Sequence, residues 1–127
     1  MSPPSRPNLG RGRVVRVEVV DPQGRNRKSR PAVVISTAEE VEMTGEFFAV
    51  CVSRRHDQAP PEVQVALPFG SHGTVCRSGL REPSWAVATW VINSRESDVE
   101  VLGTVPVAVV DEILAIVARL DSDRGPP

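Results

Sequence analysis

The sequence predicts a mainly β protein, a small curled antiparallel barrel with one C-terminal helix. Two patterns predict this fold class. Short β-branched stretches separated by turn residues recur up to about residue 102, whereas apolar residues near the end of the chain recur at helical spacing. The chain has 127 residues, 40% of them apolar, enough for one domain with a buried core. We expect a single domain over residues 10–121, a disordered tail at 1–9 and a frayed tail at 122–127.

The expected elements follow the alternation of apolar and polar residues. Six strands are expected, at residues 15–20, 31–36, 46–53, 63–67, 85–92 and 99–102, and a helix from about Pro106 to Leu120. Pro31 opens the second strand, where its missing N–H does least harm. The connections are expected to be a turn at Asp21–Gly24, an exposed mobile loop at Arg25–Arg30, a helical turn or loop at Thr37–Gly45, a polar loop at Arg54–Pro61, and an irregular segment at Pro68–Arg81 with a short strand near Val75.

The net charge of −1 conceals an uneven distribution. The first 36 residues carry eight Arg and Lys against two acidic residues, and the remaining 91 carry seven against fourteen. Fourteen of the fifteen cations are arginine, whose guanidinium group suits bidentate contact with phosphate. A basic region on a near-neutral protein indicates a polyanion or an acidic peptide as partner. A solvated arginine-rich surface is the alternative.

Several function classes find no support in the sequence. No apolar run reaches the roughly 18 residues of a membrane span, and the proline-rich N-terminus has no apolar secretory segment. Cys51 and Cys76 form neither a disulfide framework nor a metal knuckle, so a cytoplasmic protein with reduced thiols is expected. There is no glycine-rich phosphate loop and no nucleophile elbow. Any catalysis is therefore expected to need neither a metal nor a cofactor.

Two basic clusters adjoin predicted strands. The first contains Arg25, Arg27 and Lys28, and the second contains Arg54, Arg55 and His56. The first leads into Arg30 at the start of one strand, and the second follows Ser53 at the end of another. If these strands are neighbours, Arg30 and Ser53 meet in a groove lined by cations. Such a groove is suited to a phosphodiester backbone.

Several segments occur in a characteristic order along the chain. They are residues 12–17, residues 21–29, Arg30–Ser36 with its Arg-Pro-apolar motif, and Val50–Ser53. Residues 83–92 and 101–104 follow and lead into the helix. This order resembles the MazF/PemK (Kid) toxins over roughly residues 10–120. The resemblance implies an SH3-like barrel of the MazF/PemK/CcdB kind that forms a homodimer and cleaves single-stranded RNA without a metal. It also implies a cognate antitoxin whose acidic disordered tail blocks the RNA groove.

By the same resemblance, Arg30 and Ser53 take the places of the catalytic arginine and threonine or serine, and residues 21–29 that of a mobile loop at the substrate. The two basic clusters are then RNA-binding residues. RNA supplies its own nucleophile, the 2′-OH, so the protein must position the strand and stabilise charge on the phosphorus. Arg30 suits a role as electrostatic clamp or proton donor, because an arginine pKa above about 12 leaves almost none deprotonated. Ser53 would hydrogen-bond a non-bridging oxygen, and the products would be a 2′,3′-cyclic phosphate and a 5′-hydroxyl.

One strand departs from the family pattern. The family places acidic, Gln or Arg residues along it, whereas Ala86–Ile92 contains none of them. A non-catalytic barrel that binds nucleic acid or a peptide is therefore the alternative function. The single residues also have plainer interpretations: Arg30 as an exposed cation, Ser53 as a turn residue and His56, beside Asp57, as a solvated loop histidine. Trp85 and Trp90 are expected in the core or a dimer interface, with base stacking as the alternative.

Overall fold

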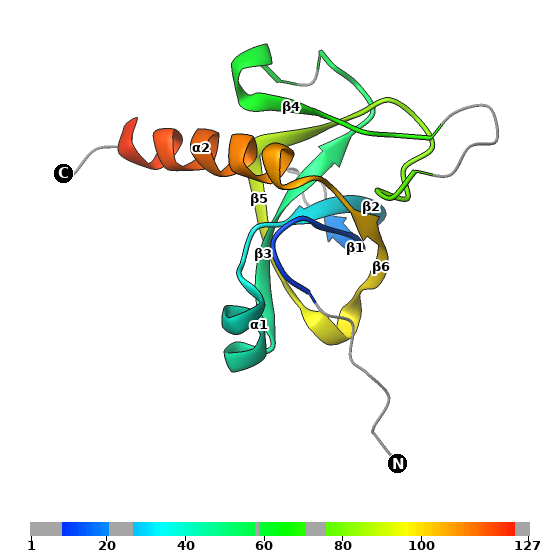
Figure 1. The fold of residues 1–127 in the computed structure, drawn as a ribbon, viewed down its shortest axis with the longest axis vertical. Helices are drawn as coiled ribbons and strands as arrows, with labels where there is room; N and C mark the ends of the chain where they lie inside the picture. The colour runs from blue at the N-terminus through cyan, green and yellow to red at the C-terminus, as the bar shows by residue number, and fades with distance from the viewer. Residues whose placement is uncertain (1–8, 21–26, 58, 71–75, 124–127) are drawn as a thin grey trace.

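The computed structural model describes residues 9–20, 27–57, 59–70 and 76–123, which form a curled antiparallel sheet with two helices (Figure 1). The strands are β1 (Arg13–Val20), β2 (Arg27–Val34), β3 (Glu46–Ser53), β4 (Gln64–Leu67), β5 (Ser84–Arg95) and β6 (Glu100–Thr104). Their order across the sheet is β4-β5-β3-β2-β1-β6. The helices are α1 (Ala38–Thr44) and α2 (Val107–Asp123), and short 3-10 turns cover Pro61–Val63 and Glu96–Asp98. The fold class predicted from the sequence is confirmed.

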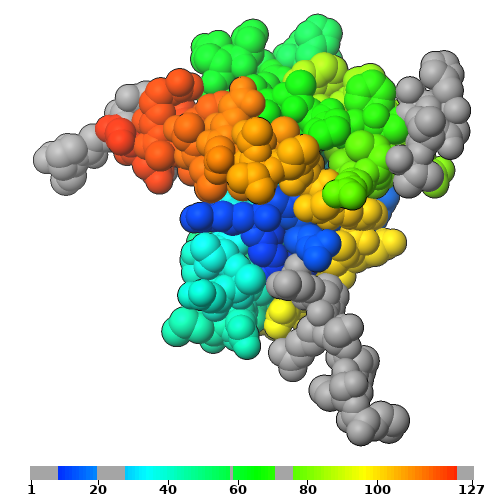
Figure 2. Space-filling model, viewed as in Figure 1, coloured from blue at the N-terminus to red at the C-terminus, as the bar shows by residue number. Residues whose placement is uncertain are grey.

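The sheet buries apolar side chains on both faces. One face packs against α2 through residues such as Val50, Val52 and Ala86 with Ile113. The opposite face gathers a second cluster around Val17, Ala32, Cys51 and Phe47, which α1 joins through Val41. We call these the α2 face and the α1 face. Figure 2 shows α2, in orange and red, lying directly above the blue atoms of the N-terminal part of the chain. Within the described residues, neither helix is long and apolar enough to cross a membrane.

Two irregularities bend the sheet. Between the pairs Val50↔Val91 and Val52↔Ala86, β5 carries four residues opposite one of β3, and β6 has an extra residue opposite β1 at Val14/Val15. Such bulges increase local twist and curl the sheet. The segment before β5 connects the two edge strands, β4 and β6. Just after β4, Gly70 N–H donates a hydrogen bond to the Leu80 carbonyl, and in β6 Thr104 N–H donates one to the Arg77 carbonyl. Gly103 permits this approach, since a Cβ there would collide with the Arg77 carbonyl oxygen.

The start of β2 differs from the sequence prediction. Residues 27–30, expected in an exposed mobile loop, pair with β1 from Val20↔Arg27 to Val17↔Arg30. The ladder with the apolar β1 outweighs the low strand propensity of a cationic run. Pro31 therefore lies inside the strand and not at its start. It is tolerated there because the ladder to β3 begins only at Ala32.

Other boundaries also move. Leu9, expected in the disordered tail, is buried beside Val15 on the α1 face because its apolar side chain completes that cluster. Val63 lies in a 3-10 turn, since Pro61 favours a helical start. β5 ends at Arg95 and α2 at Asp123, each three residues beyond the end predicted from the apolar pattern, which does not mark these last residues. The turn at 21–24, residues 1–8 and the strand expected near Val75 lie outside the described residues.

Candidate functional site

A basic groove opens where β3 ends and β5 begins, with a volume of about 610 Å³. Its walls come from β1, β2, β3, β6 and the segment preceding β5. The charged lining residues are Arg16, Lys28, Arg30, Arg54, Arg81 and Glu82. Five cationic residues and one carboxylate residue thus line the groove. A polyanion is the ligand class that this charge balance favours.

Arg30 lies at the side of this groove on the α1 face. It is half-buried, and its guanidinium carbon lies 5.3 Å from the ring centroid of Trp90, a cation–π contact. Cys51 lies nearby and is buried; burial raises the pKa of its thiol to about 12, and the Arg30 charge opposes that rise. The thiol is therefore neutral at physiological pH. Arg30 thus has an aromatic ring and an uncharged thiol as neighbours.

The strands of Arg30 and Ser53 are neighbours, which is the condition under which the sequence analysis brings the two residues together. β2 pairs with β3 through Ala32↔Cys51, and continuing this register by two residues brings Arg30 opposite Ser53. The Ser53 side chain is only 1% exposed. Its hydroxyl accepts a hydrogen bond from Arg55 N–H at 3.0 Å and donates one to the Arg55 carbonyl at 3.2 Å. Ser53 therefore holds the turn after β3, and its side chain is not among those that line the groove.

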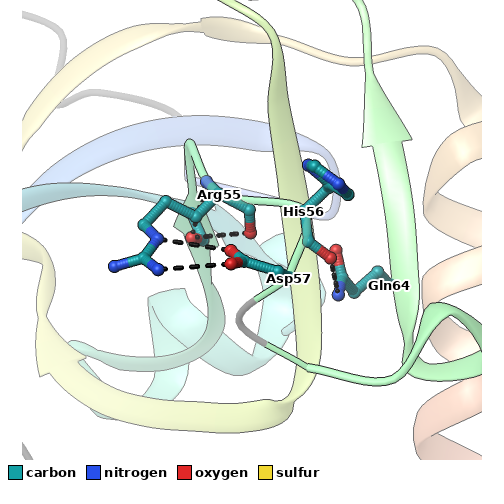
Figure 3. Close-up of polar contacts among 5 residues, drawn as sticks. Arg55, His56, Asp57 and Gln64 are labelled. Carbon is teal, nitrogen blue, oxygen red and sulfur yellow. Dashed lines mark hydrogen bonds and ion pairs between the residues drawn. The ribbon is translucent and has the colours of Figure 1, made fainter.

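The second basic cluster divides between two places. Arg54 lines the groove and binds Glu82 at 2.8 Å. Arg55 instead forms a two-pronged contact with Asp57, whose oxygens lie 3.2 Å from Nε and Nη2 (Figure 3). The contact lowers the pKa of Asp57 and raises that of Arg55. The Asp57 carboxylate is thus held by Arg55, and the neighbouring His56 makes a smaller electrostatic contribution to the lowered pKa of Asp57.

His56 makes a ring contact with Trp85. Its ring centroid lies 5.8 Å from that of Trp85, with the ring planes tilted by 51°. Both residues line a small separate pocket, described below, and neither lines the groove. Of the first cluster, Lys28 lines the groove, Arg27 lies in β2, and Arg25 lies outside the described residues. Trp85 and Trp90 are both half-buried, so neither is a fully buried core residue.

Sequence reasoning missed two lining residues of the groove, Arg16 and Arg81, and the contact of Trp90 with Arg30. Arg16 alternates with apolar residues in β1, and Arg81 follows a glycine-containing segment; neither pattern singles out one cation among fourteen arginines. Trp90 had a clearer signal, because an aromatic residue in a strand next to a basic one can hold a guanidinium group. No group of three or more metal-ligating side chains occurs within residues 9–20, 27–57, 59–70 and 76–123.

The fold and the groove together define a small curled barrel with a cationic cleft at one end. The sequence matches, over residues 10–120, the family model described as PemK-like, MazF-like toxin of type II toxin-antitoxin system. The chain therefore belongs to this toxin family, as its sequence order predicted. Among curated proteins, none matches the sequence significantly.

Solved structures share the fold. A MazE–MazF crystal structure from Deinococcus radiodurans (form III) is 23% identical with a TM-score of 0.68, covering 91% of this chain and 97% of its own. MazF alone from the same organism (form I) is 24% identical, TM-score 0.67, covering 89% and 96%. An endoribonuclease in complex with its cognate antitoxin, from a mycobacterial species, is 17% identical, TM-score 0.67, covering 89% and 94%. At these identities the likeness establishes the fold.

Proposed function

We propose that this chain is a toxin that cleaves single-stranded RNA in the groove around Arg30, with a preference for certain sequences. The observation that carries the proposal is the excess of cations in that groove, five against one carboxylate, on a chain of the PemK-like, MazF-like toxin family. The mycobacterial relative is itself an endoribonuclease with a cognate antitoxin. RNA is the polyanion that brings its own nucleophile, so the protein does not have to supply one.

Arg30 is the proposed catalytic residue. The 2′-OH loses its proton to water as it attacks the adjacent phosphorus, the bond to the 5′-oxygen breaks, and that oxygen takes up a proton from water, so the products are a 2′,3′-cyclic phosphate and a 5′-hydroxyl. The guanidinium group stabilises the charge that develops on the non-bridging oxygens and donates a hydrogen bond to the leaving oxygen. Lys28, Arg16, Arg54 and Arg81 bind flanking phosphates. No step in this scheme requires a metal.

Ser53 has two possible roles that one variant separates. A direct hydrogen bond to the phosphate, as the family resemblance implies, requires the turn at Arg55 to open. We propose instead that Ser53 is a positioning residue, because its buried hydroxyl fixes the turn that carries Arg54 into the groove. Ser53→Ala is then expected to weaken cleavage several-fold. A loss as large as that of Arg30→Ala would support the direct contact.

Two protein partners are part of the proposal. The cations of the groove suit the acidic disordered tail of a cognate antitoxin, which would compete with RNA. A second copy of the chain would cover a separate hollow of about 790 Å³ between α2, β3 and β5, where Phe48 is 51% and Val91 41% exposed. Light scattering should report a dimer for the wild type and a monomer for Phe48→Glu. A wild-type monomer would contradict the dimer.

The test is cleavage of a long single-stranded RNA in excess EDTA by the wild type, Arg30→Ala and Arg95→Ala. Arg95 is a matched control, since it is an exposed arginine of β5 that does not line the groove. We expect discrete cuts from the wild type and Arg95→Ala, and a rate about 10² to 10³ lower for Arg30→Ala. Intact RNA with the wild type, or cuts that disappear in EDTA, would refute the metal-independent nuclease.

One observation favours a second candidate function. Trp90 stands beside Arg30 on the strand where the family carries polar residues, and Ala86–Ile92 offers no carboxylate. A barrel that binds RNA without cutting it fits this substitution. Salt-sensitive binding of RNA that stays intact over long incubation would identify that function.

A further inference from the structure

A small pocket of about 260 Å³ lies near the groove and is separate from it. Its lining residues are His56, Pro61, Gln64, Ala66 and Trp85. None of them carries a fixed charge. The His56 and Trp85 rings, tilted by 51°, form two walls of a wedge that opens to solvent. The pocket thus offers flat ring surfaces next to a cationic site.

The loop that carries His56 is held by its own hydrogen bonds (Figure 3). The Gln64 amide donates to the His56 carbonyl at 2.8 Å and also to the Ala59 carbonyl. Arg55 and Asp57 brace the loop from the other side. The backbone at His56 is therefore fixed from β4, while its side chain stays exposed. A pocket held in this way costs little ordering when a ligand enters.

The pocket lies on the same face of the sheet as Arg30. Ser53 pairs with Trp85 and Trp85 pairs with Ala66, and cross-strand partners share a face. Arg30, opposite Ser53 in the continued register, belongs to the same row. Trp85 is two strands from Arg30, about 10 Å at a strand spacing of about 4.8 Å. Neighbouring nucleotides of one strand can occupy both places.

The two tryptophans differ in what already covers them. The Trp90 ring is engaged by the Arg30 guanidinium, whereas Trp85 contacts only the exposed His56 ring among the ring and cation contacts of the described residues. We propose that the His56–Trp85 pocket binds an unpaired nucleobase of the RNA strand, next to the phosphate held at Arg30. This inference rests on the proposed function and assigns one source of its sequence preference. Aromatic faces stack on bases, and a stack on one base adds about 5- to 150-fold in affinity.

The test separates base binding from backbone binding. Short single-stranded oligonucleotides of A, C or U, with 2′-O-methyl groups that block the nucleophile, are compared with an abasic oligomer of equal phosphate number by fluorescence anisotropy. We expect at least one base-bearing oligomer to bind about 5- to 150-fold more tightly than the abasic one. This advantage should fall towards unity in Trp85→Ala, fall in part in His56→Ala and largely return in Trp85→Phe.

Two further variants serve as references. Met43→Ala changes an exposed side chain of α1 and should leave the affinities for the base-bearing and the abasic oligomers unchanged. Arg30→Ala should weaken base-bearing and abasic oligomers alike, because it removes a backbone contact. Where Trp85→Ala fails to fold by circular dichroism, His56→Ala at the exposed loop decides.

An unchanged base advantage in Trp85→Ala and His56→Ala overturns the inference, as does an advantage lost only in Trp90→Leu. If the wild type cleaves RNA yet shows no preference for bases over the abasic oligomer, the inference fails and the proposed function stands. If the wild type binds no oligomer and cuts no RNA, both fail. Loss of antitoxin binding alone in Trp85→Ala would assign the pocket to the protein partner, against the inference.

Discussion

Replacing Trp90 by leucine removes the cation–π contact to Arg30 and keeps an apolar side chain on β5. The guanidinium carbon lies 5.3 Å from the ring centroid, and both residues are half-buried. A cation–π contact between half-buried groups falls between the values for exposed and for fully desolvated pairs. It is worth about 1 kcal/mol, or about 5-fold in an equilibrium constant. Since the contact orients the group that we propose to be catalytic, we expect kcat for RNA cleavage to fall about 5-fold in Trp90→Leu, with KM nearly unchanged.

The assay is the initial rate of cleavage of a fluorogenic RNA at several substrate concentrations. Trp90→Phe keeps a ring under Arg30 and should recover most of the loss, whereas a merely structural role would not distinguish Phe from Leu in kcat. Urea denaturation shows whether each variant retains its stability. A Trp90→Leu variant of normal stability and normal kcat would refute the reasoning. A rise in KM alone would mean that Trp90 contacts the RNA.

Three further outcomes are expected. Arg81→Ala should reduce the slope of log affinity for single-stranded RNA against log salt by about 0.7, and Arg95→Ala should leave that slope unchanged in the same titration. Gly103→Ala should lower the urea midpoint more than Gly45→Ala, because the Cβ at position 103 would collide with the Arg77 carbonyl, whereas the Cβ at position 45 has open space and adds only the strain of a left-handed backbone, about 1 to 2 kcal/mol. Burial raises the pKa of Cys51 to about 12, so the folded state keeps a proton that the unfolded chain releases above about pH 9. The free energy of unfolding should therefore fall as pH rises from about 9 toward 12, by up to about 1.4 kcal/mol per pH unit. Urea titrations of Cys51→Ala should show a smaller fall over the same pH range.

The parts of the fold that the sequence predicted are those with strong periodicity. β3 matches its predicted bounds of 46–53, and α2 follows the apolar spacing that begins after Pro106. The start of β2 was missed because residues 27–30 have no apolar pattern and become a strand only through their ladder with β1. Register and ladder length depend on the partner strand, which local propensity does not contain.

For the candidate site, the sequence placed Arg30 on a strand beside that of Ser53, and the pairing of β2 with β3 agrees. It did not anticipate that the Ser53 hydroxyl would be buried under the next turn, since a serine at a strand end has the same sequence signature whichever way it points. It also treated Arg54, Arg55 and His56 as one cluster. The groove takes only Arg54, because consecutive residues after a strand end diverge in direction.

Aromatic residues make up only 4% of the chain, which gives little basis for a base-stacking platform, yet the placement of these residues matters more than their number. Trp90 stands beside Arg30 where the family's polar residues would lie, and the consequence is electrostatic. A carboxylate at that position would orient the guanidinium by pairing with it and would cancel one of the groove's five positive charges. An aromatic face orients the same group through its quadrupole and adds no net charge. Under the proposed function Arg30 acts by charge stabilisation, and the absence of a carboxylate on β5 is compatible with that mechanism and incompatible with one that needs a carboxylate base from that strand.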